Sequence, residues 1–136
     1  MDIQKFLSFI NHPAVVAIRR LQFIAAAIIF STLILTPLTP GSSIMILPDW
    51  AMHFIGNLLL YLSAWVGLTG LIKPHTLLFV LTAYSIAMEL AQSVTPNRTT
   101  DAVDLVANLI GLLLAYGIAL SLDNIFSQDS PMKESK

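Results

Sequence analysis

The stretch ELAQSVTPNRTTDAVDLVANLIG, residues 89–111, decides the fold, because it links two long apolar segments through a short polar loop. It contains acids, a base and several amide and hydroxyl groups in a chain that is 56% hydrophobic and only 11% charged. Soluble domains are usually ~25% charged. We therefore expect two membrane helices joined by a polar turn, and the polar groups on either side of that turn are the first candidates for a site.

The overall composition predicts an all-α membrane protein. The mean hydropathy of the 136 residues is +0.78, and helices in lipid can leave such apolar surface uncovered by protein. The net charge of −1 and the absence of a basic run argue against nucleic acid as a partner. The absence of cysteine excludes disulfides, thiolate metal sites and cysteine nucleophiles.

Apolar runs of membrane-spanning length predict a four-transmembrane-helix bundle with a short N-terminal amphipathic helix. The predicted spans are 21–38, 50–72, 76–94 and 102–122, each close to the roughly 20 residues that cross a bilayer. A leader, residues 1–20, has the spacing of a surface helix that we expect Pro13 to end. A solvated, positively charged leader is the alternative. Residues 123–136 are predicted to form a polar tail.

The bases predict the orientation of the bundle. Six of the seven lie in the leader, in the turn at Lys73 or in the tail, and only Arg98 falls on the other side. By the positive-inside rule, both termini would lie in the cytoplasm. The polar loop near Arg98 would then face the extracytoplasmic side.

Helical periodicity predicts that each of the last three spans has a face with a polar half and a small-residue half. On the second span these residues are Asp49, His53, Gly56, Asn57, Leu60, Ala64 and Gly67; on the third, Thr82, Ser85, Glu89, Gln92 and Ser93; on the fourth, Asp104, Asn108, Gly111, Ala115 and Ala119. Small residues allow close helix approach. We expect the polar halves to converge near one membrane surface.

Glu89 is the sharpest candidate, because an acid inside a membrane helix is costly and is by default a functional candidate. We expect it ~7 Å below the helix end, at 1.5 Å per residue. Arg98 is its expected partner, with a planar fork suited to carboxylate or phosphate. Two alternatives are an ion pair that only fixes the loop, and a clamp on Arg98 by Asp104 and Asn108.

Asp49-x3-His53 places an acid and an imidazole one helical turn apart. This spacing can hold a metal or position a general base, but such pairs more often form a structural hydrogen bond. We therefore predict no metal and no cofactor. The serines and threonines lie in no nucleophile-elbow sequence, and the sequence has no phosphate-binding glycine loop.

The order and spacing of these residues resemble VanZ-like membrane proteins over about residues 48–117. The matching positions are Asp49-x3-His53-Phe54, Glu89-x2-Gln92, Arg98, Asp104, Asn108 and Gly111. Trp50 departs from the pattern, since a lysine commonly follows the aspartate. The resemblance implies a bacterial inner-membrane protein concerned with the cell envelope. The family is named for a member linked to low-level teicoplanin resistance, which does not carry over to this chain.

Three functions remain open from the sequence. The favoured one is binding or modifying an amphipathic envelope molecule, such as a lipid-linked precursor, with Arg98 at its anionic head group. The predicted binding residues are Asp49, His53, Glu89, Gln92, Arg98, Asp104 and Asn108. The alternatives are a metal-assisted or acid/base hydrolase or transferase, with Glu89, His53 and Asp104 as catalytic candidates, and a structural or assembly protein. The small residues of the last span leave a homodimer open.

Overall fold

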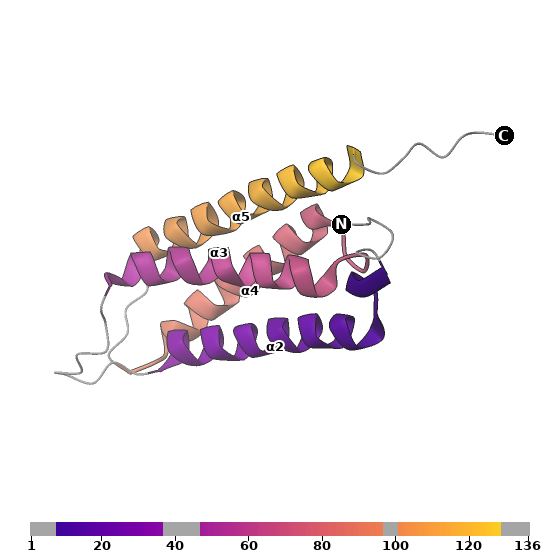
Figure 1. Ribbon diagram of the computed structural model, residues 1–136. Coiled ribbons are helices and arrows are strands. Elements are labelled where there is room, and N and C mark those ends of the chain that lie inside the picture. The colour runs from indigo at the N-terminus through magenta and orange to yellow at the C-terminus, as the bar shows by residue number, and fades with distance from the viewer. Residues whose placement is uncertain (1–7, 37–46, 97–100, 129–136) are drawn as a thin grey trace.

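The protein is a bundle of four long helices, seen in a computed structural model that describes residues 8–36, 47–96 and 101–128 (Figure 1). The helices are α2 (Pro13–Leu35), α3 (Asp49–Leu68), α4 (Pro74–Gln92) and α5 (Ala102–Gln128). A short helical turn at residues 8–10 precedes them, and these ranges contain no strand. All four helices are long and apolar enough to cross a membrane. The all-α, four-span prediction is confirmed.

The short helical turn at residues 8–10 ends before Pro13, as predicted, but Pro13 also begins α2, which corrects the extent of the predicted leader. Proline is tolerated in the first turn of a helix, where its missing N–H has no intrahelical partner to bond. The His12 side chain caps the same turn, since its Nδ1 accepts from the backbone N–H of Ala14 at 3.3 Å. Residues 13–20, assigned to the leader from the sequence, therefore form the first two turns of α2.

The other boundaries also differ from the predicted spans. Helix α3 ends at Leu68, and Gly70 adopts a φ of 81° in the turn that follows, a conformation that favours glycine. Pro74 then opens α4. Helix α5 continues to Gln128, into the predicted tail, because neither glycine nor proline interrupts residues 118–128. The Asp101 side chain caps the start of α5 by accepting from the backbone N–H of Val103 at 3.0 Å.

Helix α3 lies between α2 and α5, and α4 crosses obliquely on another side of all three (Figure 1). Successive helices run in opposite directions, so the starts of α3 and α5 lie at the same end as the ends of α2 and α4. The apolar core includes Leu60, Tyr61, Ala64, Leu112, Ala115 and Ala119. Many leucine, isoleucine and valine side chains are exposed on the outside, as expected where lipid covers the surface.

Glycine allows α3 to approach its two neighbours at backbone distance. A Cβ atom on Gly111 would collide with the backbone carbonyl oxygen of Phe54 in α3. A Cβ on Gly67 would lie 2.9 Å from the carbonyl oxygen of Arg19 in α2. This close packing holds α3 and α5 together along the length that contains their polar residues.

Candidate functional site

The polar halves of α3, α4 and α5 converge inside the bundle, as the periodicity predicts. His53, Asn57, Ser85, Glu89, Gln92, Asp104 and Asn108 are all buried, whereas Ser93 is exposed. Six residues form what we call the polar cluster, with the rim residue Asp49 included: Asp49, His53, Asn57, Glu89, Asp104 and Asn108. Because these residues occupy the first half of α3 and of α5 and the second half of α4, the cluster lies toward one end of the bundle.

Asn108 is the hub of the polar cluster. Its Oδ1 lies 3.0 Å from Nδ1 of His53 and 2.6 Å from Nδ2 of Asn57. Its Nδ2 reaches Glu89 Oε2 at 3.5 Å. One carboxamide on α5 therefore connects side chains from α3 and α4, and all four residues are buried.

The hydrogen bonds determine which His53 nitrogen bears a proton. Asn57 Nδ2 lies 3.0 Å from the backbone carbonyl oxygen of His53, which can only accept, so this Asn57 atom is a donor. The same atom donates to Asn108 Oδ1, and Asn108 Nδ2 in turn faces a carboxylate. His53 Nδ1 thus faces an acceptor and must carry a hydrogen. In a neutral imidazole, Nε2 then holds the lone pair.

Three carboxylates surround the His53 ring. Asp49 Oδ1 lies 3.9 Å from Nε2, and Glu89 Oε2 lies 3.8 Å from Nδ1; both separations are too long for hydrogen bonds. Asp104 lies close enough for one atom each of Asp49, His53 and Asp104 to fall within 4.8 Å of the others. Asp49 and His53, which the sequence predicts on one helical face, therefore have a third group beside them, Asp104 of α5.

Several buried polar atoms have no hydrogen-bond partner within the described part of the chain. They include Glu89 Oε1, Asn57 Oδ1, Ser85 Oγ and Gln92 Oε1. Buried polar groups in native proteins are normally paired, because an unpaired group costs about 1–3 kcal/mol. Carboxylate and amide oxygens only accept, and the serine hydroxyl can also donate. The cluster therefore retains capacity to bind further donors.

A groove between α4 and α5 leads from the apolar surface to this polar region. It has a volume of about 150 Å³ and is lined by Thr82, Ser85, Ile86, Leu105, Asn108, Leu109 and Leu112. Ile86 and Leu109 are exposed at its edge, whereas Ser85 and Asn108 are buried. The surface of the groove is therefore almost entirely apolar, and the polar side chains of Ser85 and Asn108 lie buried at its floor.

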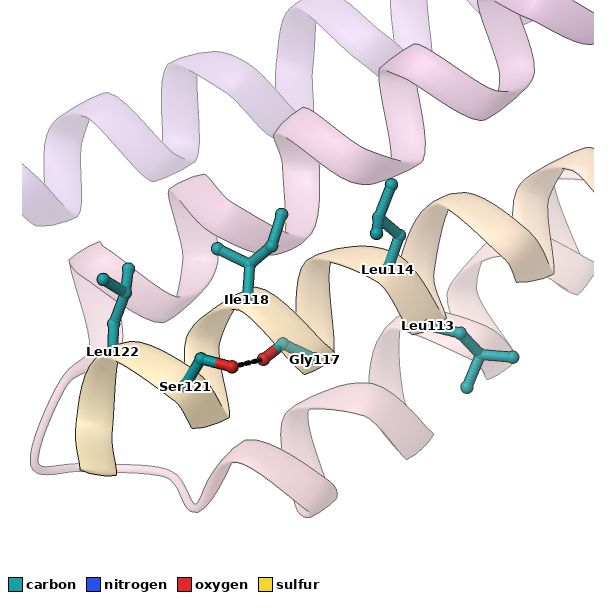
Figure 2. A pocket seen from close by; sticks show the side chains of 6 residues that line it. All are labelled: Leu113, Leu114, Gly117, Ile118, Ser121 and Leu122. Carbon is teal, nitrogen blue, oxygen red and sulfur yellow. Dashed lines mark hydrogen bonds between the residues drawn. The ribbon is translucent and has the colours of Figure 1, made fainter. Parts of the chain in front are cut away.

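A second hollow lies on the outer face of α5, away from the polar cluster (Figure 2). Its volume is about 450 Å³, and it is lined by Leu113, Leu114, Gly117, Ile118, Ser121 and Leu122. The Ser121 hydroxyl donates to the Gly117 carbonyl of the same helix at 2.9 Å. With its one polar side chain bonded within its own helix, this shallow surface offers only packing.

The predicted site residues thus divide into three groups. Asp49, His53, Glu89, Asp104 and Asn108 come together in the polar cluster. Gln92 points elsewhere, because its Nε2 donates to the carbonyl oxygen of Ile34 in α2 at 3.0 Å. Arg98 lies outside the described residues, so its expected pairing with Glu89 and the alternative clamp by Asp104 and Asn108 remain predictions.

Two residues of the site were not predicted as ligands. Asn57 bonds directly to the hub, and Ser85 lines the groove with an unpartnered hydroxyl. Both lie on the predicted polar faces, one turn after His53 and one turn before Glu89. Their position on the polar faces was the one sequence feature that could have identified them. Because their side chains are neutral, nothing distinguished them from ordinary packing residues.

Four apolar helices that enclose a polar cluster define a multi-pass helical membrane protein. Within that class, the VanZ/LLP1 family model matches residues 6–126. The chain belongs to this family, and the match extends the resemblance seen at residues 48–117 to nearly the whole chain. No curated protein and no solved structure matched the chain in the same comparisons.

Proposed function

We propose that this VanZ-like protein binds, and thereby presents or modifies, an amphipathic molecule of the bacterial envelope. The polar part of the molecule would sit at the polar cluster, and an apolar part would lie in the groove between α4 and α5. A lipid or lipid-linked precursor has both a polar head group and an apolar chain. The proposal includes an inner-membrane location with both termini in the cytoplasm, supported by the distribution of lysine and arginine.

The observation that supports binding most strongly is that the floor of the groove lies next to unpartnered buried polar atoms. Ser85 and Asn108 line the groove, and Asn108 donates to Glu89 in the polar cluster. Ser85 Oγ and Glu89 Oε1 have no partner in the described part of the chain. A ligand head group that enters through the groove would satisfy these atoms.

The chemistry of the unpartnered atoms favours a head group rich in hydrogen-bond donors. In the polar cluster, Glu89 Oε1 and Asn57 Oδ1 can only accept, which suits hydroxyl or amine groups. Arg98 remains the expected contact for an anionic part of the same molecule. If binding leads to reaction, Glu89, His53 and Asp104 are the groups that could transfer a proton.

The groove provides a direct test. Ile86 lines its mouth and is 44% exposed, so Ile86→Trp would fill the groove without entering the core. Leu90→Trp is the matched control, because Leu90 lies one turn along α4, is 66% exposed and does not line the groove. We expect lipid extracts of gently purified protein, measured by mass spectrometry, to contain an enriched species that Ile86→Trp loses and Leu90→Trp retains.

Equal retention of every lipid by the wild type, Ile86→Trp and Leu90→Trp would contradict the proposal. A structural role for the polar cluster would then be favoured. Circular dichroism of all three proteins ensures that a loss of lipid is not a loss of fold.

A further inference from the structure

We propose that Asp49, His53 and Asp104 form a binding site for a divalent transition-metal cation at the rim of the polar cluster. The site would be built from the first turns of α3 and α5 and would use His53 Nε2 with one oxygen from each aspartate. This inference does not depend on lipid binding, since it follows from the arrangement of three side chains. It departs from the sequence-based prediction of no metal because Asp104, from α5, joins the Asp49–His53 pair.

One possible ligand atom from each of the three residues lies near the other two, although the His53 nitrogen closest to Asp104 is not fixed by this grouping. These atoms lie within 4.8 Å of one another, and His53 Nε2 is 3.9 Å from Asp49 Oδ1. Metal–ligand bonds of ~2.0–2.2 Å hold tetrahedral ligands ~3.3 Å apart. A small rotation of the carboxylates would bring the atoms to these distances, and the Asp49 side chain has room to rotate because it is 36% exposed.

The orientation of His53 supports coordination through Nε2. Its Nδ1–H donates to Asn108 Oδ1, and that oxygen is itself fixed by the Asn57 amide. Histidine ligands usually donate their second ring N–H in this way, which sets the tautomer and the ring plane. In the neutral imidazole, Nε2 carries a lone pair and lies 3.9 Å from an Asp49 oxygen that is also an acceptor, and a cation between the two atoms would make this proximity favourable.

Glu89 gives an independent indication that a cation could be held nearby. Its side chain is more than nine-tenths buried, and Oε1 has no hydrogen-bond partner among the described residues. The same carboxylate interacts electrostatically with His53 and with Asp104. A buried carboxylate normally requires a compensating charge, and an ion held by Asp104 and His53 would provide one nearby.

The ligand set indicates the class of metal. One imidazole and two carboxylates suit zinc, manganese or iron(II) better than magnesium or calcium, which prefer oxygen ligands alone. The partial exposure of Asp49 gives an ion a route from the membrane surface. Three protein ligands would leave at least one coordination position for water or another molecule.

Metal binding by the full-length protein in detergent tests the site. Zn²⁺ and Mn²⁺ would be titrated by isothermal calorimetry, and Co²⁺ would be followed by its visible absorption, after chelator treatment and desalting. We expect one ion per chain in the wild type. Asp49→Asn and Asp104→Asn should each weaken binding by more than about tenfold, because loss of a group that only orients a ligand already costs about 10- to 100-fold.

Asp101→Asn is the matched control. Asp101 is an exposed acid beside the start of α5 that caps the helix through its side chain, and asparagine is an equally good cap. We expect it to bind metal like the wild type. The proposal is overturned if folded wild type binds no metal, or if folded Asp49→Asn and Asp104→Asn bind it as tightly as Asp101→Asn does. Lipid retention in the Ile86→Trp experiment can succeed or fail independently of this result.

Discussion

Replacing Asn108 with alanine should destabilise the bundle through the loss of its polar hub. Three hydrogen bonds end on this side chain, from His53, from Asn57 and to Glu89. Interhelical hydrogen bonds in membrane proteins average about 0.6 kcal/mol and reach about 1.7, so the three bonds together contribute about 2 kcal/mol. The buried His53 Nδ1–H would also lose its acceptor, which adds about 1–3 kcal/mol. We expect a total loss of about 3–5 kcal/mol.

The free energy of unfolding can be measured in mixed micelles by titration with a denaturing detergent, with helicity and tryptophan fluorescence as readouts. Ser121→Ala is the control on the same helix, because its hydroxyl bonds only to the Gly117 carbonyl; it should stay within about 0.5 kcal/mol of the wild type. If Asn108→Ala also stays within about 0.5 kcal/mol, the hydrogen-bond network does not stabilise the bundle and our reading of the hub is wrong.

Three further predictions test the packing and the topology. Gly111→Ala should be less stable than Gly117→Ala by about 1–3 kcal/mol. Both changes bring the same gain in helix propensity, but only the new methyl group at position 111 collides with backbone, at Phe54. Equal stability of the two variants in the unfolding titration would refute the close approach of α3 and α5. Tyr84→Phe removes the 2.6 Å hydroxyl contact with Ser31 and should cost about 0.5–1.5 kcal/mol; a double-mutant cycle with Ser31→Ala should show coupling, and strict additivity would argue against the contact. A reporter enzyme that works only in the cytoplasm should be inactive when fused after Pro96 and active when fused after Lys136, and activity at Pro96 would reverse the proposed orientation.

Much of the fold follows from the sequence because a bilayer permits few backbone conformations. A helix in a membrane must satisfy its own backbone hydrogen bonds, so four apolar runs predict four helices. The polar and small residues of the last three runs share helical phase, and phase alone predicts that His53, Glu89 and Asn108 face one another. The family resemblance rested on the same residues.

Other features depend on tertiary contacts that periodicity does not contain. A proline can follow the end of one helix or begin the next. Pro13 begins α2, whose first turn is capped by the His12 side chain. Asn108 can act as the hub only because α5 is turned so that this side chain faces α3. Gly111 allows the two helices to lie close together in this orientation. Gln92 shares the phase of Glu89, yet it bonds to the end of α2 because α4 crosses the bundle at an angle.

The central claim is that the polar cluster binds a ligand and does not only stabilise the bundle. The substitution Glu89→Gln tests this claim most directly. Glutamine keeps one oxygen that can accept from Asn108 Nδ2, removes the buried charge and replaces the other acceptor oxygen with an NH2 donor of similar size, so the fold should be retained. The measurement is the amount of the enriched lipid species per folded protein, by mass spectrometry, beside the free energy of unfolding. We predict that Glu89→Gln is as stable as the wild type and loses most of the retained species. Full retention, or a loss that only parallels unfolding, would contradict a binding role for the cluster.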